Sequence, residues 1–278
     1  MREITCAAIT DTVEKLCMRA CTLLPPETAM LIDCAVDTEE SPVARSVLQD
    51  LCENFTYAGA NELPICQDTG MAVVFAELGQ EAHITGGLFA DAINEGVRRG
   101  YVLLRKSVVA DPLRRGNTND NTPAVTHVKL VEGDRLKLTL APKGFGSENM
   151  SAMKLFLPSA DKSEVVDFIV ETADKAGSNP CPPIIMGVGL GGTIEQAALL
   201  SKWALCRPMD KRHPDPFYAE LEREALRRVN DLGIGPQGFG GRTTALAVNI
   251  ETYPTHIAGM PCVVNMSCHA TRHAEAVL

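Results

Sequence analysis

"NPCPPIIMGVGLGGTIEQAALLSK", residues 179–202, is the stretch that decides how this chain folds. Its apolar run, residues 183–189, is followed by a glycine-rich turn and then by residues with helical spacing. This order predicts a strand, a tight turn and a helix. Cys181 stands just before the run, with one proline before it and two after it. The glycines therefore either bind a dinucleotide phosphate or form the scaffold behind the cysteine.

The spacing Gly187-X-Gly189-X-X-Gly192 matches the pattern that binds dinucleotides between a strand and a helix. Dinucleotide-binding folds with this pattern also have an acidic residue at the end of a second strand, about twenty residues further on. The chain reads "LCRPMDKRHPDP" there, residues 205–216, with no strand pattern before Asp210. We therefore favour glycines that let the helix pack close to the strand, and keep a nicotinamide-dependent oxidoreductase as an alternative.

The neighbouring segments alternate between helical and strand patterns. Helical spacing covers residues 3–23, 42–55, 87–104, 161–177, 193–205 and 215–233, and strand patterns cover 71–78, 183–189 and two segments near the end. Polar and apolar residues alternate on both sides of Gly133, over residues 126–142, and this pattern predicts a β-hairpin. The chain is predicted to have a mixed α/β (α+β) fold. A helical N-terminal region, 1–60, is expected to form one structural unit with a mixed α/β region, 61–278.

Composition excludes several classes of function. The net charge of −9 over 278 residues argues against general nucleic-acid binding. The longest apolar runs, such as residues 184–190, are far shorter than the roughly 20 residues of a membrane helix, and the N-terminus does not resemble a signal peptide. We expect a cytoplasmic protein. Its ten cysteines then indicate thiols or metal ligands, with Cys17 and Cys21 as buried apolar residues.

The stretch "LPICQDTGMAVVF", residues 63–75, places polar side chains at the entrance of a predicted strand. After Cys66, the polar side chains of Gln67, Asp68 and Thr69 are costly to bury without partners. A local turn explains an aspartate here, but it does not explain the cysteine before it. We interpret the group as a ligand thiolate with an amide and a carboxylate beside it, directed at a bound substrate.

Two more segments carry candidate groups. The stretch "HIAGMPCVVNMSCHATRHA" contains Cys262 and Cys268 on either side of a short apolar run, with the histidines His256, His269 and His273 nearby. Cysteine and histidine in this mixture allow a zinc site, so a zinc-stabilised interaction protein is a second alternative. The glycines of "APKGFGSENMS", residues 141–151, can present backbone N–H groups to an anion.

Five segments together resemble the α subunit of the two-subunit iron–sulfur hydro-lyases, which are the class I fumarases and the L(+)-tartrate dehydratases. They are "CQDTG" at 66–70, "KGFGSENMS" at 143–151, the opening stretch at 179–202, "LGIGPQGFGG" at 232–241 and "MSCHATRHA" at 266–274. Their order and their spread over the chain make the resemblance more specific than any single motif. The chain resembles the fumarase α subunits more closely.

The resemblance implies a 4Fe-4S cluster that is held by three cysteines, Cys66, Cys181 and Cys268. Iron–sulfur clusters usually have four cysteine ligands, so three ligands leave one iron open to act as a Lewis acid on a hydroxyl group. The implied reaction is the reversible dehydration of L-malate to fumarate. Dehydration of L(+)-tartrate is the alternative within the same family.

The resemblance also implies roles for individual residues. Gln67, Asp68, Arg105 and the backbone of Gly146 match substrate-binding positions, and Asp68 and His256 match catalytic positions. Arginine suits a dicarboxylate because its planar fork binds carboxylates with two hydrogen bonds. From the sequence alone, Arg105 is equally well explained as a solvated charge at a helix end, and His256 as a histidine bound within its own loop.

The chain ends ten residues after Cys268. Members of the family that work as one polypeptide continue into a second domain with further arginines, a lysine and a threonine. We therefore expect this chain to be inactive alone, to require a separate β subunit, and to form an α2β2 assembly. Its substrate is expected to be a small dicarboxylate, with neither nucleic acid nor membrane as a partner.

Overall fold

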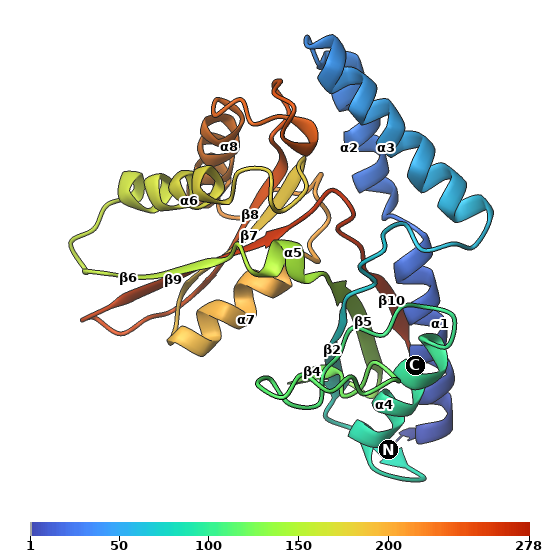
Figure 1. Cartoon of the computed structure of the whole chain (residues 1–278). Helices are drawn as coiled ribbons and strands as arrows, with labels where there is room; N and C mark the ends of the chain where they lie inside the picture. Colours follow the sequence, from blue (N-terminus) through green and yellow to red (C-terminus); the bar gives the residue numbers. More distant parts are fainter. Residues whose placement is uncertain (1) are drawn as a thin grey trace. The chain divides into compact units, whose positions relative to one another are not determined.

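The computed structural model describes residues 2–278 and divides into two compact units (Figure 1). The first unit contains Met1–Pro25, Phe55–Gly144 and Arg272–Leu278, and the second contains Pro26–Asn54 and Phe145–Thr271. Both units combine helices with a four-stranded sheet. The predicted mixed α/β fold is therefore confirmed.

The first unit is built on a sheet with the strand order β10-β5-β2-β4. Its elements are β1 (Arg2–Thr5), α1 (Cys6–Thr22), β2 (Met71–Gly79), β3 (Ala82–Thr85), α4 (Phe89–Gly100), β4 (Val125–Val131), β5 (Leu136–Lys143) and β10 (Ala274–Val277). Helix α1 packs on β5, β10 and α4, and β1 pairs with β3 in a separate short sheet. The helix predicted over residues 3–23 thus begins later, at Cys6, with the Thr5 hydroxyl accepting the N–H of Ala8 as its N-cap.

The predicted β-hairpin over residues 126–142 is wrong in its pairing. Both strands form, but β2 lies between them, parallel to β4 and antiparallel to β5. The turn at Gly133 instead closes around the end of β2, where Gly79 donates to the carbonyl of Arg135 and Glu81 donates to that of Gly133. Alternation along the chain identifies strands, but it does not show which strand each one pairs with.

The core of the first unit lies between α1, α4 and the sheet. Ile9, Val13 and Leu16 of α1 are buried there. Cys17 and Cys21 are also fully buried, as predicted, and burial raises the pKa of both thiols. Helices α1 and α4 approach closely because Gly96 carries no side chain: a Cβ there would lie 2.6 Å from that of Val13.

The second unit is built on a sheet with the strand order β6-β9-β7-β8. Its elements are α2 (Pro26–Thr38), α3 (Pro42–Ala60), α5 (Phe145–Glu148), β6 (Ala152–Phe156), α6 (Lys162–Ala176), β7 (Ile184–Gly191), α7 (Ile194–Ala204), α8 (Pro216–Asn230), the 3-10 turn η1 (Pro236–Gly238), β8 (Ala245–Tyr253) and β9 (Met260–Ser267). The last residues of α3 belong to the first unit. Among the helices of residues 2–278, none combines the length and the apolar character needed to cross a membrane.

Strand β7 lies inside the second sheet and is buried along its whole length. Figure 1 shows α6 and α8 on one face of this sheet and α7 on the other. Met186 and Val188 contribute to the core shared with α6 and α8. On the other face, Cβ atoms at Gly187 and Gly189 would lie 2.1 Å and 1.9 Å from the carbonyl oxygens of Ser201 and Ala197. The prediction that these glycines let a helix pack against the strand is confirmed.

Candidate functional site

The loop of residues 66–70 in the first unit leads directly into β2. Gln67 is exposed, and Cys66 and Asp68 are half-buried. The Cys66 thiol donates to Oε1 of Gln67 at 3.4 Å, and its sulfur accepts the N–H of Asp68 at 3.4 Å. Oδ1 of Asp68 in turn accepts the N–H of Gly70 at 2.9 Å, which closes a tight turn. The three polar side chains therefore stand at a strand entrance, as the sequence predicts.

Buried side chains hold this loop by its carbonyl groups. The donors are Arg272 to Asp68 (2.5 Å), Tyr101 and Cys21 to Thr69 (2.8 and 3.7 Å) and Asn121 to Gly70 (3.2 Å). Burial raises the pKa of Tyr101 well above its ordinary value, which keeps its hydroxyl protonated as a donor. Three successive carbonyls thus accept hydrogen bonds from side chains, which fixes the backbone path of residues 68–70.

Arg105 lies five residues after the end of α4, in irregular chain. Its side chain is exposed, and its carbonyl oxygen accepts the hydroxyl of Thr69 at 2.6 Å. Helix α4 ends too early for Arg105 to be a helix-end charge, but the interpretation as a solvated charge agrees with its exposed side chain. The backbone of Arg105 is bound to the loop that carries Gln67 and Asp68.

In the second unit, Cys181 stands three residues before Ile184, the first residue of β7, and directly in front of a cis Pro182-Pro183 bond. It is exposed, and its φ of 57° lies in the left-handed region that residues other than glycine seldom adopt. Gln237 of η1 donates twice to the carbonyl of Pro182, from its backbone at 2.8 Å and from its side chain at 2.7 Å. Cys181 is thereby presented at the start of the strand.

Cys268 directly follows β9, which runs antiparallel to β7. The backbone N–H of the next residue, His269, donates to the carbonyl of Cys181 at 3.3 Å. Nδ1 of His269 lies 3.1 Å from that carbonyl and 3.1 Å from the amide nitrogen of Gln237. This nitrogen either donates to the carbonyl or accepts from the amide, depending on the tautomer. The structure therefore brings together the segments that carry Cys181 and Cys268.

Gly146 and His256 occupy different parts of the second unit. A Cβ at Gly146 would lie 3.9 Å from the carbonyl oxygen of Asn179, two residues before Cys181. His256 is exposed in the loop before β9, and its Nδ1 accepts the N–H of Ala258 at 3.1 Å. Strand β9, eight residues or about 26 Å long at about 3.3 Å per residue, lies between this loop and Cys268. Gly146 is thus close to the Cys181 segment, and His256 is at the other end of the sheet.

The zinc alternative does not agree with the geometry. Cys262 is fully buried within β9, and burial raises its pKa to about 12. Over residues 2–278, no three His, Cys, Asp or Glu side chains are grouped as ligands of a metal ion. Of the three cysteines named from the resemblance, Cys66 belongs to the first unit, and Cys181 and Cys268 belong to the second.

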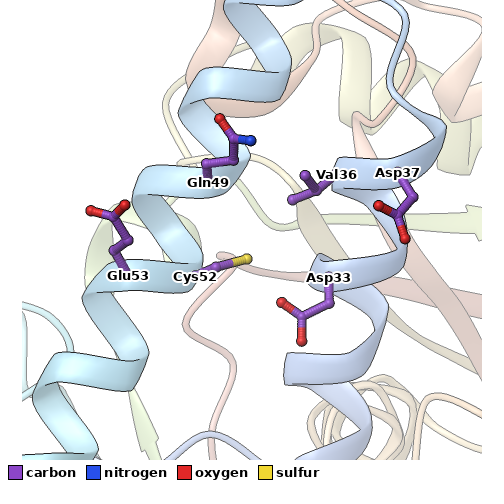
Figure 2. Close-up of a pocket in the computed structure, with 6 residues that line it drawn as sticks. All are labelled: Asp33, Val36, Asp37, Gln49, Cys52 and Glu53. Carbon is purple, nitrogen blue, oxygen red and sulfur yellow. The ribbon is translucent and has the colours of Figure 1, made fainter.

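A separate pocket of about 530 Å³ lies between α2 and α3 (Figure 2). It is lined by Asp33, Val36, Asp37, Gln49, Cys52 and Glu53. Burial, together with Asp33, raises the pKa of Cys52 to about 12, so this thiol stays neutral. Three carboxyl groups and no basic side chain line the pocket, which makes it unsuited to a dicarboxylate.

Sequence reasoning missed the residues that support the loops. Tyr101 and Asn121 support the loop of the first unit, and Gln237 supports that of the second. Tyr101 lies in a helical pattern, and Asn121 lies in the polar stretch "NTNDNTP", which is typical of an ordinary loop. Gln237 stands in one of the five segments, but nothing in its own type indicates which carbonyl it binds.

Comparison with known proteins gives matches over nearly the whole chain. Residues 10–277 match the family model described as Fumarate hydratase (Fumerase). A Methanocaldococcus jannaschii protein with the provisional name L(+)-tartrate dehydratase subunit alpha is 37% identical over 274 residues, 96% of this chain and 96% of that protein. The L(+)-tartrate dehydratase subunit alpha of Escherichia coli O157:H7 is 30% identical over 274 residues, 97% of this chain and 90% of that protein. Both units lie within these matches.

Proposed function

Because the chain belongs to the fumarate hydratase (Fumerase) family, we propose that it is the α subunit of a 4Fe-4S-dependent hydro-lyase that interconverts L-malate and fumarate. The observation that carries the proposal is the connection between the Cys181 and Cys268 segments through His269. Two cysteines that are not buried, from segments far apart in sequence, are held together at one end of a sheet.

Three cysteines are proposed as the cluster ligands, and their surroundings suit that role. Cys66, Cys181 and Cys268 stand in loops and are at least partly exposed, whereas Cys17, Cys21 and Cys262 are buried and have raised pKa values. The raised pKa values keep the buried thiols neutral, whereas iron binds the thiolate. The N–H of Asp68 already points at the sulfur of Cys66, as hydrogen bonds do at cluster sulfurs.

When bound, the cluster would supply one iron with an open position as a Lewis acid. The chain's own residues would bind and orient the substrate. Arg105 presents an exposed guanidinium to one carboxylate, and Gln67 and the backbone of Gly146 supply further hydrogen bonds. Asp68 is proposed as a catalytic residue because it lies in the same loop as Cys66 and Gln67, and its backbone N–H binds the Cys66 sulfur.

His256 is the second proposed catalytic residue. It lies at the end of the sheet opposite Cys181 and Cys268, so it would act in the site of another copy of the chain. We also propose a separate β subunit, since the relatives carry the name subunit alpha, and an α2β2 assembly in the cytoplasm. The β subunit would supply the remaining groups for proton transfer.

Dehydration of L(+)-tartrate is the second candidate function. The names of the relatives favour it, whereas the family model carries the description fumarate hydratase. The two substrates differ by one hydroxyl group. Assays of the co-expressed α and β subunits on malate, tartrate and citramalate decide between them by the ratio of kcat/KM values.

The dinucleotide alternative loses its support in the structure. The backbone of α7 packs directly on Gly187 and Gly189. A Cβ atom added to either glycine would clash with it. That face of β7 is therefore filled by a helix, and the glycines serve packing, as predicted. A nicotinamide enzyme would bind its nucleotide saturably without iron, which metal and sulfide analysis distinguishes from a cluster protein.

The cluster ligands are tested by a pair of cysteine variants. Cys181→Ser is expected to abolish the iron and sulfide content of anaerobically prepared protein, because serine is a poor ligand for cluster iron. Cys206→Ser is the control, since Cys206 is buried and donates to the carbonyl of Lys202. Equal loss of iron and sulfide in both variants, or full retention in both, would show that the ligands are assigned incorrectly.

A further inference from the structure

Two buried cross-links join the loop of residues 66–70 to the segment of Arg105. The hydroxyl of Thr69 donates to the carbonyl of Arg105 at 2.6 Å. The side chain of Asn121 donates to the carbonyl of Gly70 at 3.2 Å and accepts the N–H of Ser107 at 2.8 Å. Thr69 and Asn121 are 1% and 0% exposed. The backbone that follows Arg105 is therefore bound at two points, the carbonyl of Arg105 and the N–H of Ser107.

These cross-links take the place of regular secondary structure. Between the end of α4 and the start of β4, the described residues contain no helix or strand, only turns and an isolated bridge, Val109 to Asn117. An irregular segment of this length holds its shape only where other groups bind its N–H and carbonyl groups. Thr69 and Asn121 provide such bonds next to Arg105, whose own side chain points into solvent.

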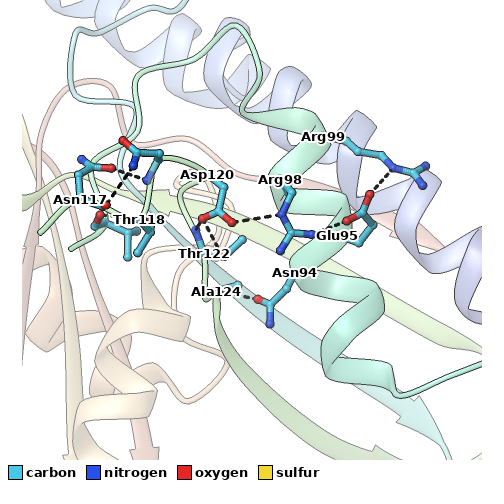
Figure 3. Close-up of polar contacts among 11 residues, drawn as sticks. Asn94, Glu95, Arg98, Arg99, Asn117, Thr118, Asp120, Thr122 and Ala124 are labelled. Carbon is cyan, nitrogen blue, oxygen red and sulfur yellow. Dashed lines mark hydrogen bonds and ion pairs between the residues drawn. The ribbon is translucent and has the colours of Figure 1, made fainter. Parts of the chain in front are cut away.

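The residue before Asn121, Asp120, is bound to Arg98 of α4 (Figure 3). The φ of Asn121, 63°, is one that asparagine tolerates better than most residues. The neighbouring Asp120 accepts from Arg98 of α4 at 3.1 Å and from the N–H of Thr122 at 3.0 Å. Burial opposes ionisation, but the N–H and hydroxyl of Thr122 and the guanidinium of Arg98 outweigh it and lower the pKa of Asp120 to about 2.

We propose that Thr69 and Asn121 are positioning residues that fix the distance between the Arg105 guanidinium and the side chains of Gln67 and Asp68, and so set the site for a dicarboxylate. The inference rests on the proposed function through the roles of Arg105 and Gln67. Thr69 and Asn121 act through the backbone and need not touch the substrate. Preset geometry of this kind lowers the entropy that binding must remove.

Thr69→Val tests the first cross-link, because valine keeps the shape of threonine and removes its hydroxyl. In the iron-loaded enzyme with its β subunit, we expect KM for the dicarboxylate to rise about tenfold, with kcat changed by less than about threefold. The dissociation constant for succinate, an unreactive dicarboxylate, is expected to rise by a similar factor in calorimetric titration. Iron and sulfide content is expected to stay that of the wild type.

Two controls separate positioning from general stability. Thr69→Ser restores the hydroxyl and is expected to return KM to within about twofold of the wild type. Thr10→Val removes a comparable buried hydroxyl bond in the same unit, to the carbonyl of Ala92 at 3.0 Å, and is expected to leave KM unchanged.

Asn121→Asp tests the second cross-link, because it keeps the acceptor for Ser107 but replaces the amide donor to Gly70 with an oxygen. It is expected to raise KM even if Thr69→Val does not fold.

The outcomes distinguish two kinds of failure. If the wild type turns over substrate but Thr69→Val and Asn121→Asp leave KM and the succinate affinity unchanged, the positioning role is wrong. The same follows if Thr10→Val raises KM as much as Thr69→Val does. If the wild-type complex holds no iron and sulfide, or turns over neither malate nor tartrate, the proposed function is wrong.

Discussion

The two cysteine-bearing loops are held by different combinations of donors. In the first unit, buried side chains of Arg272, Tyr101 and Asn121 donate to successive carbonyls of residues 68–70. In the second unit, the main-chain N–H groups of Gln237 and His269 donate to the carbonyls of Pro182 and Cys181, and the side chain of Gln237 donates to Pro182 as well. A side-chain donor is lost by one substitution, whereas a main-chain N–H remains in every variant except proline. The first loop therefore depends on side-chain donors, whereas the second loop has main-chain donors in addition to a side-chain donor.

The largest effect is expected from Gly189→Ala, which tests the dependence of the second unit on backbone packing. The added Cβ would lie 1.9 Å from the carbonyl oxygen of Ala197. Separating α7 from β7 is expected to lower the free energy of unfolding by about 3 kcal/mol or more, as measured by urea denaturation. Gly259→Ala is the control, since nothing lies within 4 Å of its Cβ position. Equal midpoints for the two variants would contradict the comparison.

An intermediate effect is expected from Glu39→Gln, at another place where the second unit relies on main-chain donors. The buried carboxylate of Glu39 accepts N–H groups from Arg242 at 2.9 Å and Thr243 at 3.2 Å. Burial raises the pKa of Glu39, but these donors and those of Ser41 and Glu40 outweigh it and hold the pKa below 4.5. Loss of the charge is expected to cost about 2 kcal/mol at neutral pH.

The pH dependence of this contribution has a defined sign. Because the folded-state pKa is lowered, the stabilisation is fully present above pH 4.5 and is lost as pH falls through the folded pKa. The difference between wild type and Glu39→Gln in urea denaturation is therefore expected to shrink in acid. Glu40→Gln, at an exposed neighbouring carboxylate, is the control and is expected to change stability by less than about 0.5 kcal/mol. A pH-independent difference for Glu39→Gln would rule out the carboxylate as its cause.

The smallest effect is expected from Tyr101→Phe, which sharpens the comparison in the first unit. It removes the hydroxyl that donates to Thr69 at 2.8 Å, while Cys21 still donates to the same carbonyl. We expect a loss of about 1 kcal/mol in unfolding free energy and faster alkylation of Cys66, measured by mass spectrometry. Tyr57→Phe, at a side chain 64% exposed, is the control. An unchanged rate at Cys66 would mean that the side-chain donors do not control the loop.

Local sequence patterns predicted the elements of the fold better than their arrangement. The order of strand, turn and helix around Gly187 was predictable because its parts are contiguous and its glycines explain the close packing. The pairing of β4 with β2 was not predictable, because the partner strand is separated by some fifty residues of chain. Strand β10 was missed because four residues at the end of the chain carry no clear alternation.

The candidate site shows the same division. Cys66 and Cys181 stand out because a cysteine at a strand entrance is unusual, and both lie where the sequence placed them. Asn121 and Gln237 are common loop residues whose importance comes from the carbonyls of distant residues that they bind. Only the folded chain shows those partners, so the support of the loops lay beyond sequence reasoning.

The length of β9 has a consequence for genetics. If His256 acts as proposed, one chain carries cysteines for one site and a histidine for another, since β9, about 26 Å long, lies between them. Two inactive alleles, one altered at Cys181 and the other at His256, would then assemble mixed oligomers in which some sites are intact. Co-expressing them would restore a fraction of the activity that neither allele has alone.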